Sequence, residues 1–212
     1  MERRLLVGAA RTVLQMIQDR GYEVPDEVKD ASDDALFTLF SITGLGRNEF
    51  QLHPHKEQLK TKSGQWLLPP RIAWYITDSM GVKQLREIMD DVRRNRDHVP
   101  HLLLLSHAPA TSSVFTELSK QRHESPSVEI FELDKMYRNL IYHKAQPKFR
   151  VLSAEEGQII VDRFGGDPNK LLFILTTDPV VRYFGLSDCE GTIIECKRKY
   201  GTVWRIVKYQ PR

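Results

Sequence analysis

The sequence has only two cysteines, Cys189 and Cys196, which argues against a scaffold held together by disulfides. We therefore expect a reducing compartment. No apolar run approaches the ~20 residues that a membrane span requires, so we expect no membrane partner. The opening stretch, Met1-Glu2-Arg3-Arg4-Leu5-Leu6, carries charges but no long apolar core, and we expect no secretion signal.

The sequence also lacks a strong excess of either charge. The formal net charge is +3 over 212 residues, and the excess lies in residues 148–212, which hold 11 basic and 8 acidic side chains. Such a mildly basic balance is compatible with a nucleic acid nearby but does not demand one. The length allows one large domain or two modest ones.

Motifs that carry cofactor or metal chemistry are missing as well. There is no glycine-rich phosphate loop followed by Lys-Ser/Thr, and there is no nucleophile elbow. Cys189 and Cys196 could bind zinc only with two further ligands, and no histidine has paired metal spacing with them. The pair His53-Pro54-His55 has no acidic or thiolate neighbour. We therefore expect no metal, no cofactor and no catalytic residue.

The N-terminal part begins with helical patterns. Residues 2–20 predict an amphipathic helix that Gly21 ends, with Leu5, Leu6, Ala9, Val13, Met16 and Ile17 on one face. A second helical stretch begins at Val24-Pro25-Asp26 and continues through Phe40. Residues 41–65 are polar and contain glycine and histidine, and we expect an extended excursion there.

From residue 66 the pattern alternates between strands and helices. The expected elements are a strand at 66–76, a helix at 82–94, a strand at 101–106, a helix at 111–121 with Val114, Phe115 and Leu118 inward, a strand at 128–133 and a short helix at 134–142. The four consecutive leucines within 101–106 are typical of a strand buried on both faces. Short links between these elements predict right-handed crossovers and a partly parallel sheet.

Residues 143–148 have mixed charge, Pro147 and no apolar period, as a linker between domains has. Beyond them, Ser153 and Glu156 form a capping box for a helix running to Phe164. A strand at 171–175 leads into Asp178-Pro179, which opens a short helix that Gly185 stops. Two strands, 192–198 and 202–209, then flank Lys199-Tyr200-Gly201 as a basic hairpin, with Cys196, Val203 and Trp204 beneath it.

This order of strand, Asp-Pro helix and hairpin, with Asp178–Leu186 as its most specific stretch, resembles a known family. It is similar to the fifth common subunit of eukaryotic or viral multisubunit DNA-directed RNA polymerases, whose archaeal counterpart consists of the C-terminal domain alone. The likeness covers nearly the whole chain and also rests on Arg20-Gly21-Tyr22-Glu23-Val24, Gly81-Val82-Lys83 and Leu152-Ser153.

The resemblance implies an α/β (α+β) fold in two domains. Residues 1–145 would form the N-terminal jaw domain, a small mixed sheet with flanking helices like a truncated restriction endonuclease. Residues 147–212 would form the small C-terminal α/β assembly domain. A domain of that size has a marginal core, so permanent docking on a partner is plausible.

The implied function is that of a non-catalytic common subunit of a DNA-dependent RNA polymerase. The chain would be a monomer within the hetero-oligomer. It would dock on the largest subunit beside other core subunits, and contact downstream double-stranded DNA weakly and without sequence specificity. The implied location is the nucleus, or a viral particle or cytoplasmic viral factory if the protein is viral.

The resemblance also places candidate residues for the two contacts. The subunit interface would use Asp178, Pro179, Arg182, Tyr183, Lys197, Arg198, Lys199 and Arg205. The DNA-proximal set would be Lys83, Arg86, Pro109, Ala110, Thr111 and Ser112. Charge and backbone N–H groups at helix starts suit one phosphate each, but a plain helix cap at Thr111 or Ser112 and a solvated Lys83 explain the same residues.

The sequence departs from the family at several of these places. Phe149 stands where the family usually has a second histidine, Leu171-Leu172-Phe173-Ile174 replaces a Leu-Pro-Arg-Ile run, and the hairpin residues Lys197–Gly201 differ from the family's. The loop around Pro109–Ser112 replaces a Thr-Pro-Ser-Ala loop. The partner surface here is therefore expected to be a divergent one.

Two other functions stay open from the residues alone: a free-standing DNA-binding transcription regulator, and a nuclease. A metal-dependent nuclease of this type needs an acid-X-Lys triplet on a strand to hold the cation and position water. The nearest stretch, Glu129 to Lys135, separates Glu132 from Lys135 by two residues, which places them on opposite strand faces. The spacing of Glu129, Glu132 and Lys135 fits a helix better than an active strand.

Overall fold

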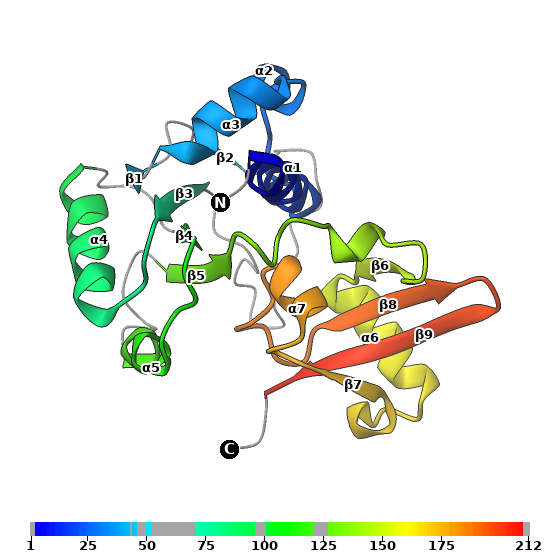
Figure 1. Cartoon of the computed structure of the whole chain (residues 1–212). Helices are drawn as coiled ribbons and strands as arrows, with labels where there is room; N and C mark the ends of the chain where they lie inside the picture. The colour runs from blue at the N-terminus through cyan, green and yellow to red at the C-terminus, as the bar shows by residue number, and fades with distance from the viewer. Residues whose placement is uncertain are drawn as a thin grey trace. The chain divides into compact units, whose positions relative to one another are not determined.

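The structure is a computed structural model that describes residues 3–42, 44–45, 50–51, 71–95, 101–120 and 127–209. These residues divide into two compact units. The first unit runs to Gln51 and then from Arg71 to Arg138, and the second runs from Asn139 to Tyr209. The two units are separate bodies of the chain, each with its own sheet (Figure 1).

The expected N-terminal helix is confirmed as α1 (Arg3–Asp19). All the apolar residues assigned to its inner face are buried except Leu5, which is half-buried. Gly21 ends the helix with a φ of +100°, a conformation that residues with a Cβ rarely adopt. The 3.6-residue period therefore predicted the helix correctly, and Gly21 predicted its end.

The second helical stretch is two helices rather than one. These are α2 (Asp26–Lys29) and α3 (Asp33–Ser41). The break occurs because Ser32 is extended and its side-chain oxygen accepts a hydrogen bond from the Ala35 N–H at 3.2 Å, which caps a new helix. An extended excursion was expected at 41–65, and the described residues there include two short strands, β1 (Gly44–Leu45) and β2 (Phe50–Gln51). His53 and His55 lie outside the described residues.

The centre of the first unit is a parallel sheet. Its elements are β3 (Arg71–Thr77), α4 (Val82–Asn95), β4 (His101–Ser106), α5 (Ser112–Lys120) and β5 (Ser127–Glu132). β3 pairs with β4 and β4 with β5, both parallel, and the short β1 and β2 pair antiparallel with β3. The strand–helix alternation is thus confirmed; residues 66–70 of the expected first strand lie outside the described part.

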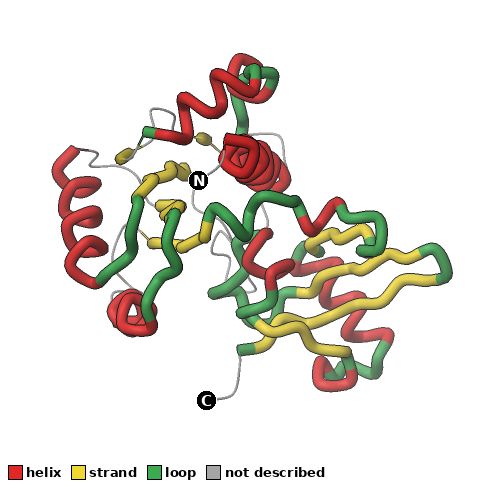
Figure 2. Tube along the Cα trace, in the orientation of Figure 1, coloured by secondary structure: helices red, strands yellow, loops and turns green. Residues whose placement is uncertain are grey.

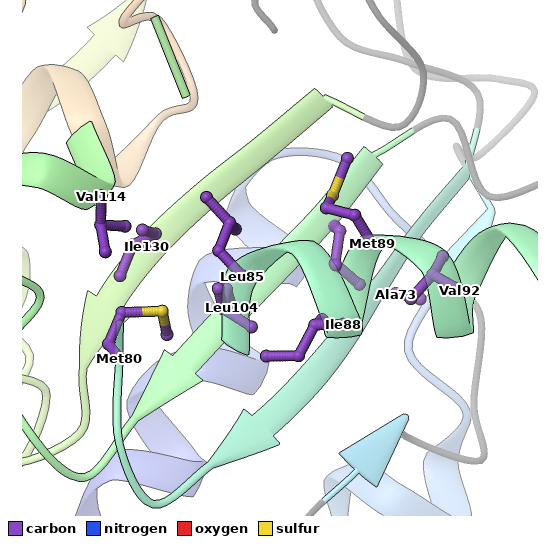
Figure 3. Packing of buried hydrophobic residues seen from close by; sticks show 10 residues of the cluster. Ala73, Met80, Leu85, Ile88, Met89, Val92, Leu104, Val114 and Ile130 are labelled. Atoms are coloured by element: carbon purple, nitrogen blue, oxygen red, sulfur yellow. The ribbon is translucent and has the colours of Figure 1, made fainter. Parts of the chain in front are cut away.

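One face of this sheet is covered by α4 and α5. Residues of both helices and of alternate strand positions form one buried cluster, shown in Figure 3: Ala73, Met80, Leu85, Ile88, Met89, Val92, Leu102, Leu104, Val114 and Ile130. On the opposite face, Trp74 stacks on Phe40 of α3 at 5.0 Å between ring centroids and lies 5.2 Å from Phe50. Every residue of β4 is buried, as its leucine run predicted.

Two details of the first unit differ from expectation. Phe115 points outward and is 49% exposed, because Val114 and Leu118 already occupy the inner side of the short α5. Residues 134–142 do not form one helix: turns follow β5, and only η1 (Leu140–Tyr142) is helical. The side chain of Asn139 accepts a hydrogen bond from the Ile141 N–H at 3.0 Å and so starts this separate turn.

The second unit is a four-stranded mixed sheet in the order β6-β8-β9-β7. Its elements are β6 (Lys148–Val151), α6 (Ala154–Arg163), η2 (Pro168–Lys170), β7 (Leu172–Leu175), α7 (Pro179–Tyr183), β8 (Ile193–Arg198) and β9 (Gly201–Lys208). β6, β8 and β9 are antiparallel neighbours, whereas β7 runs parallel to β9. Figure 2 shows the long hairpin formed by β8 and β9.

This sheet has a small core on each face. On one face, Ile160 and Val161 of α6 pack with Ile193 and Ile206. On the other, Val181 of α7 packs in one cluster with Ile194, Cys196 and Val207. The capping box of α6 is confirmed: Ser153 accepts from the Glu156 N–H at 3.2 Å, and Glu156 accepts from the Ser153 N–H at 3.0 Å. Of the three residues expected beneath the hairpin, Cys196 is buried, Trp204 is half-buried and Val203 is exposed.

The fold class is confirmed as mixed α/β with two mixed sheets. The boundary between the units follows Arg138, several residues before the expected linker. It lies there because Asn139 donates a hydrogen bond to the hydroxyl of Tyr183 at 3.0 Å and η1 packs against β6, both within the second unit. Within the described residues, no helix is long and apolar enough to cross a membrane.

Candidate nucleic-acid and subunit interfaces

The DNA-proximal candidates of the first unit gather at one edge of its sheet. Lys83 and Arg86 lie on α4, which follows β3, and Pro109–Ser112 follow β4. Because β3 and β4 are parallel, with Thr77 level with Ser106, the segments after them leave the same edge. The structure therefore brings the two groups to one side of the unit.

Lys83 is the most exposed charge of this group. Its side chain is 92% exposed, and its ammonium lies 3.8 Å from a carboxylate oxygen of Glu87 one turn further along α4. An exposed pair at that distance holds a side chain only weakly. The Lys83 ammonium can therefore exchange Glu87 for a phosphate at little cost.

Arg86 is engaged differently. Its Nε and Nη2 donate hydrogen bonds of 2.9 and 2.6 Å to Oε1 of Glu117, which joins α4 to α5. Hydrogen bonding to Arg86 lowers the pKa of Glu117, so this carboxylate stays ionised and neutralises the arginine. Arg86 thus contributes to holding the two helices together and adds little net positive charge to the edge.

The segment between β4 and α5 contributes polar groups without charge. Ala110 packs against the buried cluster of Figure 3, whereas Pro109, Thr111 and Ser112 are exposed. Thr111 precedes the first residue of α5 and its hydroxyl hydrogen-bonds that of Ser113 at 2.8 Å. The position is that of a helix cap, and the hydroxyls face solvent at the same edge as Lys83.

The acidic residues considered for a nuclease are both held by cations. Glu129 and Glu132 lie on β5, which confirms the strand expected at 128–133. Glu129 accepts two hydrogen bonds of 2.9 Å from Arg20, and His101 Nε2 lies 2.8 Å from its Oε1. Glu132 accepts a hydrogen bond from the Lys135 ammonium at 2.8 Å. The strand does not present an open pair of carboxylates to a cation.

Glu129 is ionised in spite of its burial. Burial by itself would raise the pKa of this carboxyl, but the charges and hydrogen bonds of Arg20 and His101 outweigh that effect and hold the pKa well below its usual range. The arrangement is a buried ion pair between the end of α1 and the middle of β5. Its role is structural.

In the second unit, the Asp178-Pro179 motif builds the start of α7. Asp178 Oδ1 accepts a hydrogen bond from the Val180 N–H at 2.8 Å, and Pro179 occupies the first helical position. Gly185 follows α7 with a φ of +70°. Of the interface candidates here, Tyr183 is buried, Arg182 is half-buried and Pro179 is exposed.

The basic candidates lie at the far end of the hairpin. Lys197, Arg198 and Lys199 are exposed, and the Lys199 ammonium lies 5.3 Å from the ring centroid of Tyr200. Arg205 lies on β9, level with Leu172 of β7, and is half-buried. The hairpin end thus forms a positively charged projection distinct from the Asp178–Tyr183 turn.

The two cysteines behave as core residues. Both are free thiols that belong to the cluster around Val181. Burial raises the pKa of Cys196, although Arg205 and Arg198 act in the opposite direction. In the ranges that the structure describes, no group of three or more His, Cys, Asp or Glu side chains could hold a metal ion; His123, like the His53 pair, is not among the described residues.

Sequence reasoning missed two features of the second unit. Arg150 of β6 donates to Glu195 at 3.1 Å and to Glu156 at 2.6 Å, tying two strands to the capping box. Arg150 and Glu195 lie directly opposite each other on β6 and β8, so their opposite charges would have indicated the first bond if β6 had been predicted. The second feature is the exposure of Leu172 and Phe173, which an apolar strand pattern conceals because it implies burial.

Comparison with known proteins supports the resemblance. Residues 138–211 match the family model described as RNA polymerase Rpb5, C-terminal domain. Arabidopsis thaliana "DNA-directed RNA polymerases IV and V subunit 5B" is 27% identical over 181 residues, covering 84% of this chain and 77% of that protein. Dictyostelium discoideum "DNA-directed RNA polymerases I, II, and III subunit rpabc1" is 25% identical over 208 residues, covering 97% of this chain and 95% of that protein. The identities are low, and the resemblance read from the sequence is confirmed.

Proposed function

Because residues 138–211 belong to the Rpb5 C-terminal domain family, we propose that this chain is a non-catalytic common subunit of a DNA-dependent RNA polymerase. The observation that carries the proposal is the extent of the similarity. A relative named as a polymerase subunit aligns with 97% of the chain and therefore with both units. A likeness confined to one unit would have been compatible with a shared adhesive domain on an unrelated protein.

The second unit supplies the proposed contact with the largest subunit. Lys197, Arg198 and Lys199 form an exposed cationic end, and α7 presents Pro179 at its start and Arg182 in its last turn. Interfaces favour arginine and aromatic residues at their centre and charge at their rim. Two further residues hold α7 in place beneath this surface. Asp178 caps the helix, and the Tyr183 hydroxyl accepts a hydrogen bond from Asn139.

The first unit supplies the proposed contact with downstream DNA. Lys83 offers a charge, and Thr111 and Ser112 offer hydroxyls at the same edge of the sheet. Contacts of this kind position a duplex through its phosphates without reading its sequence. The neutralisation of Arg86 by Glu117 keeps the contact weak.

A non-catalytic role agrees with the state of the acidic residues. Glu129 is bound by Arg20 and Glu132 by Lys135, so neither is available as the metal ligand of a nuclease. A polymerase subunit works in the nucleus of a eukaryotic cell, and the relatives named above give no support to a viral particle or factory.

Purification of the tagged chain from its native cells at high salt tests the proposal. We expect the two largest polymerase subunits to co-elute and to be identified by mass spectrometry. A solitary monomer that shifts duplex DNA by itself would instead establish the free-standing regulator. Mg²⁺- or Mn²⁺-dependent DNA cleavage that Glu132→Ala abolishes would establish the nuclease.

A charge-reversed hairpin tests the contact surface. The triple variant Lys197→Glu, Arg198→Glu, Lys199→Glu should retain far less polymerase than the wild type while keeping its own circular dichroism spectrum. The matched control, Lys144→Glu with Arg163→Glu, reverses exposed charges elsewhere in the same unit and should retain the polymerase fully. Equal retention by both variants would remove the hairpin from the interface.

A further inference from the structure

The edge strand β7 carries apolar side chains that the described part of its own unit leaves exposed. In the sheet of the second unit, β7 follows β9 at one end of the order, and none of the other described strands pairs with its outer side (Figures 1 and 2). Native proteins usually protect such edges with charge, proline or a covering element. β7 has none of these among Leu172-Phe173-Ile174-Leu175.

The backbone of β7 offers hydrogen-bonding groups on that outer side. The N–H of Thr176 donates to the carbonyl of Lys208 at 3.0 Å, so it points toward β9. Direction alternates along a strand, and the amides of Leu175 and Phe173 therefore point away from β9. A further strand laid beside β7 can pair with these groups.

Leu172 and Phe173 are exposed on opposite faces of the sheet. Leu172 is 60% exposed and Phe173 is 59% exposed, although neighbouring Leu171 and Ile174 are buried. Consecutive residues of a strand point to opposite faces, so a partner lying flat on one face covers only one of them. An additional strand at the edge brings its own side chains to both faces and covers both.

Cations outnumber carboxylates around the edge by three to two. Lys170 lies two residues before the start of β7, Arg205 is level with Leu172, and Lys208 is level with Leu175. Two carboxylates, Asp167 and Asp178, also lie nearby; they keep their charge but accept hydrogen bonds from the N–H groups of Asn169 and Val180 at the starts of η2 and α7. Apolar side chains on both faces beside cations favour an occupant that combines apolar and acidic residues.

We propose that β7 pairs with an extended acidic and apolar segment of another polymerase subunit, which adds a fifth strand to this sheet. Strand addition gives affinity through main-chain hydrogen bonds and specificity through alternate side chains. The proposal rests on the proposed function, because it assigns the partner of this edge to the polymerase. It adds a second contact that does not use the charged hairpin end.

A pair of substitutions at Phe173 separates strand pairing from simple apolar contact. Phe173→Ala removes the ring and keeps the outward N–H, whereas Phe173→Pro also removes that N–H. Proline is tolerated at edge positions whose N–H points outward, so the pairing with β9 is kept. In pull-downs of the native polymerase with the full-length tagged chain, we expect retention to fall about threefold for Phe173→Ala and at least about tenfold for Phe173→Pro.

Controls keep the outcome readable. Ile159→Ala removes an exposed aliphatic side chain of α6 that is 54% exposed and should retain the polymerase as the wild type does. Circular dichroism and thermal unfolding establish whether each variant folds. If Phe173→Pro does not fold, N-methyl-leucine can replace Leu175 by semisynthesis, which removes the other outward N–H. This second variant should show the same tenfold loss of polymerase retention.

The results distinguish the two levels of the proposal. A wild-type chain that retains no polymerase overturns the proposed function. Wild-type retention with equal retention by Phe173→Ala and Phe173→Pro overturns strand addition alone. Sedimentation of the purified wild-type chain as a dimer that Phe173→Pro converts to a monomer also overturns it, because the edge then pairs with a second copy of this chain.

Discussion

The guanidinium of Arg20 donates two hydrogen bonds of 2.9 Å to the carboxylate of Glu129, across 109 residues of sequence. The Arg20 side chain is fully buried, and its Nη2 also lies 3.8 Å from the sulfur of Met16. The pair fixes the end of α1 against the middle of β5. Its position in the first unit explains why a carboxylate that looks catalytic in the sequence is a structural residue.

Breaking this pair on one side should destabilise the protein strongly. Arg20→Met leaves the Glu129 charge buried without its main partner, which costs about 3–5 kcal/mol of unfolding free energy. Chemical denaturation of the full chain measures the loss. Arg11→Ala, which breaks the exposed pair between Arg11 and Asp33, is the matched control and should cost less than about 1 kcal/mol.

The double variant Arg20→Met, Glu129→Leu should recover part of the lost stability. Replacing a whole buried ion pair by apolar side chains is often close to neutral, because no unpaired charge remains. A double variant as unstable as Arg20→Met alone would show that Glu129 has a further essential partner, for which His101 at 2.8 Å is the obvious residue.

Acid should weaken the fold over a defined range. The pKa values of Glu129, Glu117 and Glu156 are all lower in the folded chain than usual: Arg20 and His101 outweigh burial at Glu129, and hydrogen bonds from Arg86 and Arg150 act at the other two. A group of this kind stabilises the fold fully above its unfolded pKa of about 4.3 and loses that contribution as pH falls further. Unfolding free energies at pH 7, 5, 4 and 3 should therefore be similar down to about pH 5 and decline below it. The unfolding free energy of the double variant Glu117→Gln, Glu156→Gln should decline less below pH 5 than that of the wild type. An equal decline would contradict the assignment of the acid sensitivity to these carboxylates.

Removing the charge of Glu117 should strengthen DNA binding. Glu117→Gln leaves Arg86 at the edge with Lys83 but without its neutralising carboxylate. The affinity of the assembled polymerase for a short duplex, measured by fluorescence anisotropy, should rise, and its salt dependence should steepen by about one phosphate contact. Glu155→Gln, an equal charge change in the other unit, should leave the affinity unchanged. Lys83→Ala should lower it only slightly, since one phosphate contact is a small share.

Gly8 is a helix residue that should not tolerate a methyl group. Within a helix, alanine is favoured over glycine by about 0.5–1 kcal/mol. A Cβ at Gly8, however, would lie 2.6 Å from the ring of Tyr137 and 2.8 Å from its carbonyl oxygen. Because a backbone atom cannot move aside cheaply, overpacking should prevail, and Gly8→Ala should lower the unfolding free energy by about 1–3 kcal/mol. Gly81→Ala, whose Cβ would meet only the Gln84 side chain at 3.6 Å, is the control in thermal unfolding.

The sequence predicted the regular elements well because their signals are local. The apolar period of α1, the leucine run of β4 and the capping box at Ser153 each need only neighbouring residues to be recognised. The short helix after Asp178 follows from the geometry of Asp-Pro and from Gly185. Where one short pattern decides the structure, the prediction and the structure agree.

The site was less predictable because its properties depend on distant partners. Nothing near Arg86 in the sequence indicates that Glu117 neutralises it, and nothing near Glu129 indicates Arg20. β6 was not predicted because a run of only four alternating residues beside a linker is too short to be recognised, and because its partner β8 lies 45 positions away at Arg150 and Glu195. Burial of Tyr183 likewise depends on the fold of the whole second unit.

The bond between Arg20 and Glu129 sets an order for events at the ribosome. The partner of Arg20 is made 109 residues later, which at 5–20 residues per second is a delay of about 5–20 s. During that interval Arg20 lacks the carboxylate with which it is buried in the folded chain, so the end of α1 should reach its final packing only after β5 has emerged.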